Sequence, residues 1–320
     1  MPSVFSVVKK NMTKTQIYTN RSGLRHDTGP GHPEQIARLE TVLALLKEAP
    51  FSALPVIEAT AADEDTIALA HDRAYIHSIA DASPEEGYVR LDPDTVISPG
   101  SWQAALDAAG ALCMAVDDVA AGKITRAFCA VRPPGHHAEP HRSMGFCLFN
   151  NIFIGARHAQ EAHNIERIAI IDFDVHHGNA TDLMARGAED IFFISSHQSP
   201  FWPGNGDPHD DVPGKTLNIP LPAGTGSAAF RNIYEEQVFP AIDAFKPDLI
   251  MISAGFDAHR DDPLAGLMLE DDDYFWVTEK LCALADKHCG GKVASALEGG
   301  YNLDVLKRAV GAHLKALAEI

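Results

Sequence analysis

Short runs of apolar residues recur along the chain, and each is followed by a polar motif and then by a segment of helical character. Runs of this length, rich in β-branched residues, are typical of buried strands. The sequence therefore predicts strands at residues 127–131, 168–171, 191–194, 249–253 and 293–297.

Between these runs, apolar residues recur every three or four positions, which is the spacing of amphipathic helices. Strands that alternate with helices predict an α/β fold with a single parallel β-sheet sandwiched between helices. The expected helices cover residues 34–48, 102–121, 151–163, 180–187, 227–245, 271–289 and 303–318, with two short helices within 62–81.

The remaining segments are expected to form loops. Residues 1–33 are polar, and residues 83–100 combine prolines and glycines with acidic residues, which indicates a long surface loop. No linker, composition shift or internal repeat divides the sequence, so we expect one domain that spans residues 1–320.

The stretch from Ile168 to His177, IAIIDFDVHH, begins as a strand and ends in acids and histidines. Side chains of an extended chain alternate between two faces, so Asp172, Asp174 and His176 are expected on one face. A carboxylate oxygen beside an imidazole nitrogen is a ligand combination that suits zinc. The alternative is a strand end with solvated acids and a chance histidine.

The other polar motifs also follow predicted strands, and ligands of open parallel sheets bind beyond the carboxyl ends of the strands. Asp257 follows the strand at 249–253 and supplies a second carboxylate. Together with Asp174 and His176 it makes three protein ligands, which leave a position open for water. Alternatively, Asp257 is a loop acid that caps the next turn.

His136 and His137 follow Pro-Pro-Gly, a rigid turn that would fix both rings. A histidine beside a metal-activated water can act as general base and then as general acid. One ring of such a pair can be neutral and the other charged. A surface histidine pair is the alternative interpretation.

Tyr301 follows Gly299 and Gly300, where the backbone can approach a ligand closely. Its phenol could donate a hydrogen bond to a carbonyl oxygen, or the ring could simply pack on a rim. Phe146 and Trp202 lie in predicted loops, where two facing rings would form a narrow slot for an aliphatic chain. Ordinary packing is the alternative role for both rings.

The net charge and the absence of several well-known motifs make some functions less favoured than others. The formal net charge of −18 would repel a nucleic-acid backbone and attract a cationic substrate. We find no G-x-x-x-x-G-K-[ST], no G-x-G-x-x-G after a strand and no G-x-S-x-G, so amide or ester cleavage is favoured over phosphoryl or hydride transfer.

Composition also bears on the compartment. The five cysteines contain no C-x-x-C, which predicts reduced, buried thiols. No apolar run reaches the roughly 18 residues that a membrane span needs. Residues 1–14 place an apolar patch before lysines, the reverse of a signal peptide. We expect a cytoplasmic protein with neither a membrane nor a nucleic-acid partner.

The motifs, in their order along the chain, resemble the zinc-dependent histone deacetylase and acetylpolyamine amidohydrolase superfamily. The motifs HHGN, GFDA, DPLAG and EGGYN are similar to those of the class II branch of this superfamily and its bacterial relatives. The matching runs are HDTGPGHPE (26–34), VRPPGHHAE (131–139), GFCLFNN (145–151), DFDVHHGNAT (172–181), SAGFDAHRDDPLAGL (253–267) and LEGGYNL (297–303).

The resemblance implies a helix-sandwiched parallel sheet related to arginase, and removal of acetyl groups from lysine side chains or polyamines. It implies one catalytic zinc ion held by Asp174, His176 and Asp257. It implies that His137 is the general base and acid, with His136 as an electrostatic partner.

Further roles follow from the same resemblance. Tyr301 would polarise the acyl carbonyl, while Asp172 and Asn179 would stand behind His136 and His137 respectively. Asp172 and Ser195 would bind a structural potassium ion together with backbone carbonyls of residues 174 and 176. A second potassium site cannot be assigned to particular side chains.

The implied substrate channel departs from the family pattern in two places. Trp202 stands where the family usually has Phe. Leu264 occupies the position of the acidic gatekeeper of polyamine-selective relatives, which favours acyl-lysine. The channel is expected to be lined by Gly145, Phe146 and Trp202, with Leu264 at its rim and Asp94, or alternatively Asp92, binding the substrate backbone or amine.

The expected partner is an acetylated lysine peptide or an acetylated polyamine. The alternatives are an acetylpolyamine-selective enzyme, an arginase-like hydrolase with two manganese ions, and a non-catalytic acyl-lysine binding protein. Homo-oligomer formation is left open by the sequence.

Overall fold

The computed structural model describes residues 15–320. The N-terminal segment that was compared with a signal peptide, residues 1–14, lies outside this range. Within it, an eight-stranded sheet forms the centre of the molecule, and every neighbouring pair of its strands is parallel. The strand order is β2-β1-β5-β10-β9-β6-β7-β8.

The five predicted strands are confirmed at the centre of this sheet, and three further strands extend it. The strands of the sheet are β1 (Thr15–Thr19), β2 (Val56–Glu58), β5 (Arg126–Ala130), β6 (Ile168–Asp172), β7 (Ile191–Gln198), β8 (Thr216–Leu221), β9 (Leu249–Ala254) and β10 (Val293–Leu297).

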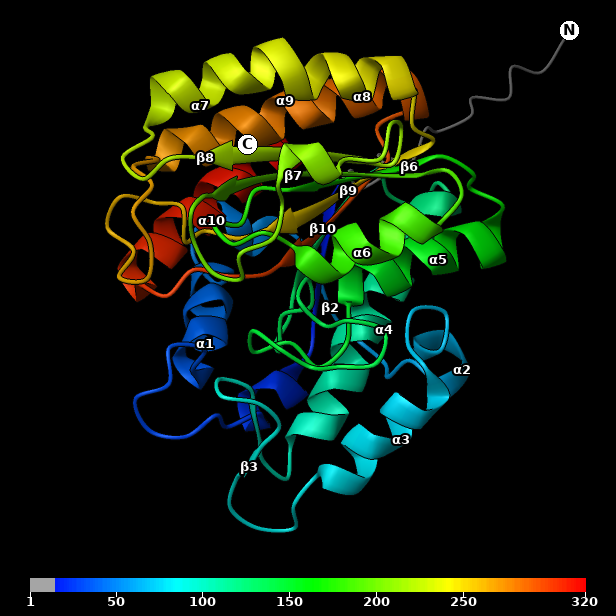
Figure 1. The fold of residues 1–320 in the computed structure, drawn as a ribbon, viewed down its shortest axis with the longest axis vertical. Helices are drawn as coiled ribbons and strands as arrows, with labels where there is room; N and C mark the ends of the chain where they lie inside the picture. Colours follow the sequence, from blue (N-terminus) through cyan, green and yellow to red (C-terminus); the bar gives the residue numbers. More distant parts are fainter. Residues whose placement is uncertain (1–14) are drawn as a thin grey trace, which may run out of the picture.

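Helices cover both faces of the sheet (Figure 1). One hydrophobic core lies between the sheet and α1, α7, α8, α9 and α10, and a second lies between the sheet and α4, α5 and α6. The helices are α1 (Ile36–Leu45), α2 (Glu64–Ile67), α3 (Arg73–Ala82), α4 (Ser101–Ala120), α5 (Asn151–His163), α6 (Asn179–Gly187), α7 (Ser227–Ile233), α8 (Phe239–Phe245), α9 (Asp271–Cys289) and α10 (Leu303–Ala318).

The predicted alternation of side chains along the central strand is confirmed. Ile168 and Ile170 belong to the core beneath α4 and α5, whereas Ile171, Phe173 and Val175 belong to the opposite core. The regular strand nevertheless ends at residue 172, and the chain then bends.

Two predicted loops contain strands. Within the described part of the segment 1–33, the expectation of a loop is wrong at Thr15–Thr19, because β1 lies inside the sheet, between β2 and β5. The short sequence TQIYT has too few apolar residues to indicate a buried strand. The segment 83–100 contains a small antiparallel pair, β3 (Val89–Arg90) and β4 (Val96–Ile97), and the whole of β4 is buried.

The helix predicted at 227–245 is confirmed, although its middle part is π-helical rather than α-helical. A π-helical segment, Tyr234–Val238, separates α7 from α8. Pro240 lies in the first turn of α8 and has no N–H to extend the α-helical ladder, which accounts for the altered turn before it. The edge strand β8 was missed for a related reason, since Pro220 interrupts its pattern and is tolerated only at a sheet edge.

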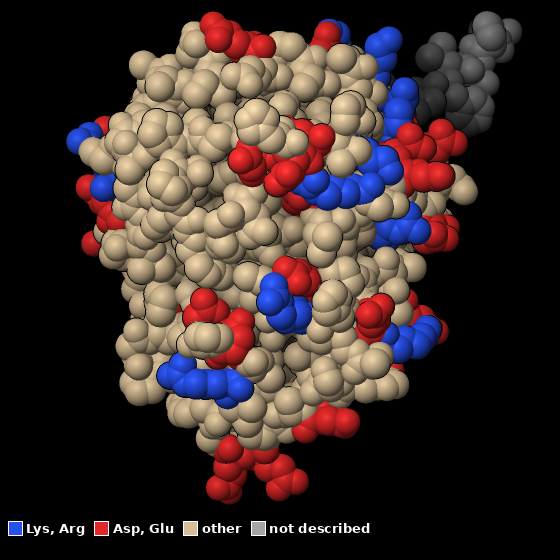
Figure 2. Space-filling view, in the orientation of Figure 1, with Lys and Arg blue, Asp and Glu red and all other residues tan. Residues whose placement is uncertain are grey.

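The cysteines agree with the prediction of buried thiols without disulfide bonds. All five are buried, and none forms a disulfide bond. On the face drawn in Figure 2, basic side chains lie beside acidic ones. Among the helices of residues 15–320, none is long and apolar enough to cross a membrane.

Candidate active site at the carboxyl ends of the central strands

The predicted chemical motifs follow four strands that are neighbours in the sheet, in the order β5, β10, β9 and β6. The histidine pair follows β5, Tyr301 follows β10, Asp257 follows β9, and Asp174 and His176 follow β6. Because these strands are parallel, their carboxyl ends meet at one edge of the sheet. The topology thus brings together residues that are far apart in the sequence.

Asp174, His176 and Asp257 form a buried cluster of potential metal ligands. The Nδ1 atom of His176 lies 3.1 Å from Oδ1 of Asp174 and 3.1 Å from Oδ2 of Asp257. Ligand atoms of a tetrahedral zinc ion, with bonds of about 2.0–2.2 Å, stand roughly 3.3 Å apart. The spacing therefore fits a zinc ion held by these three residues.

Backbone donors fix both carboxylates. The N–H of His176 donates to Oδ1 of Asp174, and the N–H of Gly299 donates to Oδ2 of the same side chain at 2.8 Å. The N–H of Val175 donates to Oδ1 of Asp257. Strand β6 has already ended at Asp172, so the following turn, rather than strand alternation alone, places Asp174 beside His176.

The charge of the cluster also calls for a cation. Burial, and then the neighbouring Asp174 carboxylate, raise the pKa of Asp257 to about 7. Two carboxylates packed together away from water repel each other unless a positive charge lies between them. Burial alone would lower the pKa of His176, but Asp174 and Asp257 raise it to about 10, so either a protonated His176 or a bound metal ion can supply that charge. A β-carbon on Gly299 would stand 2.2 Å from Oδ2 of Asp257, so only glycine leaves room at this place.

The two adjacent histidines have opposite electrostatic environments. Burial alone would lower the pKa of His136, but Asp172, Asp174 and Glu298 outweigh it and raise that pKa to about 10. Its Nδ1 atom lies 2.9 Å from Oδ2 of Asp172. Burial, and then the charge of His136, hold the pKa of His137 well below its ordinary value. His136 is therefore the charged ring and His137 the neutral one.

Asn179 determines which nitrogen of His137 is free. Nδ1 of His137 lies 2.7 Å from Oδ1 of Asn179, and an amide oxygen only accepts hydrogen bonds. The amide nitrogen of Asn179 in turn donates to Oε1 of Glu139 at 3.2 Å, which fixes the orientation of the amide. The neutral ring therefore carries its proton on Nδ1 and keeps a lone pair on Nε2.

Tyr301 lies against Phe146, with ring centroids 5.9 Å apart, and above the guanidinium of Arg38 at 5.1 Å. Burial, and then the charge of Asp257, raise the pKa of the Tyr301 phenol well above its ordinary value. The hydroxyl therefore keeps its proton and can act as a donor.

A buried ionic network lies behind Tyr301 and was not predicted from the sequence. Arg38 is fully buried and donates to the carbonyl oxygens of Gly300, at 2.7 Å, and Glu298, at 2.5 Å. Its charge is balanced by Glu34, which also binds Arg132 through both carboxylate oxygens. The spacing of Glu34 and Arg38, four residues apart at the start of a helix, was the available signal.

Two further acids also escaped the sequence analysis. Glu298 accepts the N–H groups of Gly135 and His136, so it anchors the histidine turn to the Tyr301 loop. Asp262 accepts the N–H groups of Tyr301 and Leu264, which joins that loop to the segment after β9. Both lie within the matching runs 297–303 and 253–267, but their local sequence does not indicate which backbone N–H groups they accept.

The predicted channel residues lie around the histidines. A β-carbon on Gly145 would stand 2.4 Å from the His137 ring and 2.6 Å from the Trp202 ring. Trp202 contacts His137 at a centroid distance of 4.7 Å, whereas Phe146 contacts His32 and Tyr301. Trp202 and Leu264 remain 40% and 36% exposed, as expected of residues near an opening.

Asp94 and Asp92, the two acids considered for binding the substrate, have different contacts. Oδ1 of Asp94 accepts the N–H of Gly145 at 3.2 Å, so this side chain contacts a residue that is expected to line the channel. Oδ1 of Asp92 accepts the N–H groups of Asp94 and Thr95, which makes it a cap within its own loop.

The side chains expected around potassium are also adjacent. Asp172 pairs with Ser195 across β6 and β7, and with Ser253 across β6 and β9. All three are fully buried. Oγ of Ser195 lies 3.1 Å from Nδ1 of His197.

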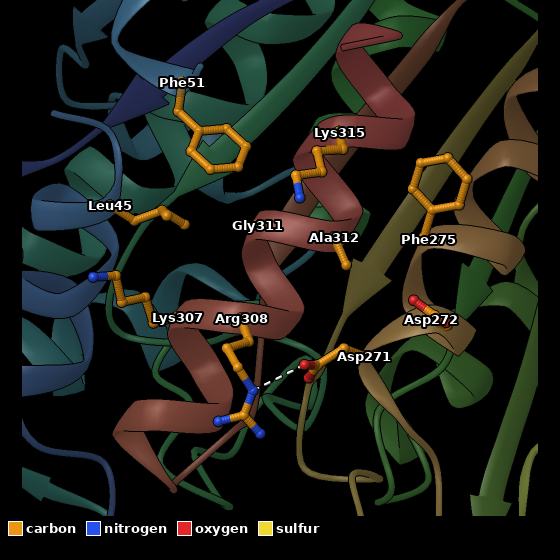
Figure 3. Close-up of a pocket in the computed structure, with 10 residues that line it drawn as sticks. All are labelled: Leu45, Phe51, Asp271, Asp272, Phe275, Lys307, Arg308, Gly311, Ala312 and Lys315. Atoms are coloured by element: carbon orange, nitrogen blue, oxygen red, sulfur yellow. Dashed lines mark hydrogen bonds and ion pairs between the residues drawn. The ribbon is translucent and has the colours of Figure 1, made fainter. Parts of the chain in front are cut away.

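A separate hollow of about 610 Å³ lies between α1, α9 and α10 (Figure 3). Phe51 and Phe275 form part of its wall, and the charged Arg308 and Asp271 at its edge are paired with each other. None of the catalytic candidates lines it, so this hollow is separate from the candidate active site.

Comparisons with known proteins agree with this geometry. Residues 32–317 match the model of the histone deacetylase domain. The chain is 40% identical to histone deacetylase 14, chloroplastic, of Arabidopsis thaliana, over 94% of this chain and 76% of that protein. It is 35% identical to a probable deacetylase of Archaeoglobus fulgidus, over 95% of this chain and 89% of that protein.

A solved structure has the same fold. The HDA15 HD domain superposes with a TM-score of 0.91 at 32% identity, covering 96% of this chain and 89% of that one. A longer relative, type-2 histone deacetylase 2 of Dictyostelium discoideum, is 36% identical over 97% of this chain, which spans about 21% of its length. The chain belongs to the histone deacetylase family, whose members are hydrolases that act on amides.

Proposed function

We propose that this chain removes acetyl or other short acyl groups from lysine side chains by hydrolysis, with one zinc ion at Asp174, His176 and Asp257. The observation that carries the proposal is the buried ligand cluster beside a neutral His137 whose Nδ1 is held by Asn179. A reader of acyl-lysine would not need a base in that protonation state.

A bound zinc ion would supply Lewis-acid polarisation of the acyl carbonyl and a lower pKa for the attacking water. His137 accepts a proton from that water on Nε2 while the water oxygen attacks the acyl carbon. The Tyr301 phenol donates a hydrogen bond to the acyl oxygen as negative charge develops on it. His137 then gives the proton to the leaving amine as the carbon–nitrogen bond breaks.

His136 has a supporting electrostatic role in this scheme. Its charge is stabilised by Asp172 and lies next to His137, where ring centroids are 3.9 Å apart. A fixed positive charge there keeps His137 neutral before the reaction and favours release of the proton to the amine afterwards. Asp172 and Asn179 hold the two rings in place, and Glu298 accepts the backbone N–H of His136.

The channel supports an acyl-lysine substrate. Gly145 lets Trp202 and His137 approach each other closely, and Phe146 lines the side that carries Tyr301. Apolar walls of this kind suit the four methylene groups of lysine. We propose that Asp94, which lies at the channel wall, binds the substrate backbone, and that Leu264 contacts the substrate at the rim.

We also propose a structural potassium ion beside Asp172 and Ser195, with backbone carbonyls of Asp174 and His176. The cross-strand pairing of Asp172 with Ser195 supports this site, since it aligns a buried carboxylate with a hydroxyl oxygen. A cytoplasmic location stays a prediction.

The substrate class can be tested at Leu264. We expect the chain to hydrolyse a fluorogenic acetyl-lysine peptide with a higher kcat/KM than N-acetylputrescine. Leu264→Glu places a carboxylate at the rim and should shift the ratio toward acetylputrescine, whereas the neutral control Leu264→Gln should not. Preference of the unmodified chain for acetylputrescine would identify a polyamine enzyme, and binding of the peptide without turnover would identify a reader.

A further inference from the structure

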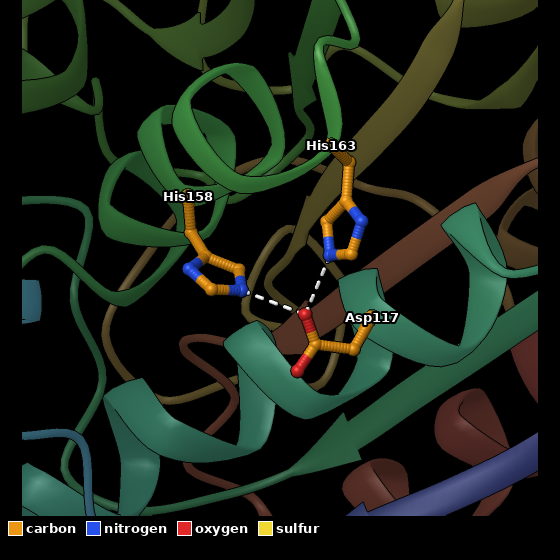
Figure 4. Close-up of side chains that lie close together, drawn as sticks. All are labelled: Asp117, His158 and His163. Atoms are coloured by element: carbon orange, nitrogen blue, oxygen red, sulfur yellow. Dashed lines mark hydrogen bonds and ion pairs between the residues drawn. The ribbon is translucent and has the colours of Figure 1, made fainter.

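A second group of metal-ligand side chains lies between α4 and α5, apart from the candidate active site. It consists of Asp117 on α4 and of His158 and His163 on α5, and we call it the α4–α5 cluster. Both imidazoles point at the same carboxylate oxygen (Figure 4). Nε2 of His158 lies 2.7 Å from Oδ1 of Asp117, and Nε2 of His163 lies 2.6 Å from it.

The cluster lies at a different edge of the sheet from the candidate active site. The N-terminal end of α5 lies near the histidine turn, since Asn151 donates to the carbonyl of Pro133. His163 is the last residue of that helix, and the chain then leads directly into β6. The α4–α5 cluster therefore lies toward the amino ends of the strands, at the opposite edge of the sheet from Asp174 and His176.

The local field favours a cation. Asp117 lies in the last turn of α4 and His163 in the last turn of α5. Carbonyl groups at a helix C-terminus carry partial negative charge, so they attract cations and disfavour acids. An acid in such a position needs a compensating positive charge nearby. A metal ion bound by all three side chains would provide that charge.

We propose that the α4–α5 cluster is a second metal site, which binds a divalent ion of the zinc class through Nε2 of His158, Nε2 of His163 and a carboxylate oxygen of Asp117. Two imidazoles and one carboxylate are a ligand set for zinc, nickel or copper rather than for magnesium, which prefers oxygen ligands alone. Three protein ligands leave at least one position for water.

Binding needs a modest rearrangement. Ligand atoms around a tetrahedral zinc ion stand roughly 3.3 Å apart, whereas the nitrogen–oxygen distances here are 2.7 and 2.6 Å. The side chains can separate, because 47% of Asp117, 20% of His158 and 27% of His163 is exposed. Each neutral ring must also carry its proton on Nδ1, a tautomer change that leaves the number of bound protons unchanged.

Without a metal, the same side chains form a hydrogen-bonded link between the helices, and the experiment must distinguish the two states. The matched control is His77, whose Nε2 atom lies 3.1 Å from Oε2 of Glu64 in an exposed pair that has no second histidine beside it among the described contacts. His158→Gln and His163→Gln each remove one ligand of the cluster. His77→Gln removes a surface histidine of the same chemistry.

The full chain, loaded with its catalytic metal and freed of excess ions, is titrated with Zn²⁺ by calorimetry, and bound metal is counted by atomic absorption. We expect a further equivalent of Zn²⁺ per chain in the unmodified protein and in His77→Gln, with at least a tenfold weaker affinity in His158→Gln and His163→Gln. The melting temperature should rise with Zn²⁺ in the first two proteins only, and Mg²⁺ should not reproduce the effect.

Hydrolysis of the acetyl-lysine peptide without added Zn²⁺ reports whether the variants are folded, since the cluster lies outside the catalytic machinery. If the unmodified protein bound no further equivalent of Zn²⁺, the proposal would be overturned. An equal affinity in His158→Gln and His163→Gln would also overturn it, because the ion would then be bound elsewhere and the cluster would be only a hydrogen-bonded link.

Discussion

Asn179→Asp replaces the neutral acceptor behind His137 with a carboxylate, and it should change the pH at which the enzyme becomes active. Nδ1 of His137 lies 2.7 Å from Oδ1 of Asn179, within a buried pair. In the unmodified protein Asn179 carries no charge that could offset the effect of burial. Burial therefore holds the pKa of His137 well below its ordinary value. A carboxylate in the same place would stabilise the protonated ring.

The size of the shift follows from the distance. Opposite charges about 4 Å apart attract by about 4 kcal/mol at an effective dielectric constant of about 20, which corresponds to about 3 pKa units. Measured shifts from one nearby opposite charge are about 1–3 units. Glu139 reduces the effect, since Oε1 of this side chain is 3.2 Å from the amide nitrogen and would repel the new carboxylate. Asn179→Asp combined with Glu139→Gln should therefore show the larger shift.

The assay is kcat/KM for the acetyl-lysine peptide as a function of pH, whose acid limb reports the base of the free enzyme. His137 must be unprotonated to accept a proton, so activity is present above its pKa and is lost below it. A raised pKa moves the acid limb to higher pH, by about 1–3 units, and Glu139→Gln alone is the control. An acid limb that stays in place in both Asn179→Asp proteins, with metal content and fold intact, would refute the assignment of His137 as the base.

Substitutions at three other residues test the remaining parts of the site. Tyr301→Phe should lower kcat by about 10²–10³ with little change in KM, the scale for loss of one oxyanion donor, as measured by steady-state kinetics. Arg38→Met should lower the free energy of unfolding in urea by about 3 kcal/mol, because it removes a partner of the buried Glu34; Arg38→Lys keeps the charge and should recover part of that loss. Gly145→Ala should lower kcat without loss of metal, because the new β-carbon would clash with the His137 ring. The backbone of Gly145, with φ of 57°, is also one that alanine rarely adopts.

The sequence was informative where chemistry and pattern coincide. Asp174, His176 and Asp257 each follow an apolar strand, and the parallel topology then requires them to meet at one edge of the sheet. The strand-to-helix alternation identified the central strands for the same reason. In contrast, β1 was missed because its position between two strands depends on long-range pairing, which its five-residue pattern does not reveal.

The support behind the site was only partly predictable from local pattern, because the i, i+4 spacing of Glu34 and Arg38 indicates an ion pair but not its burial. Arg38 and Glu298 meet only in the folded chain, where the guanidinium donates to a carbonyl 260 residues away in the sequence. Both looked like ordinary charged residues at a helix start and a strand end. Their burial follows from tertiary packing alone, as does the contact of Trp202 with His137.

The most direct test of the proposed chemistry is the metal dependence of turnover. The chain is stripped with a chelator, shown to be metal-free, and assayed on the acetyl-lysine peptide before and after addition of one equivalent of Zn²⁺. We predict loss of turnover on stripping, recovery with Zn²⁺ but not with Mg²⁺, and no recovery in Asp257→Asn. Full turnover by the metal-free chain would contradict the assignment of Asp174, His176 and Asp257 as the ligands of a catalytic zinc ion.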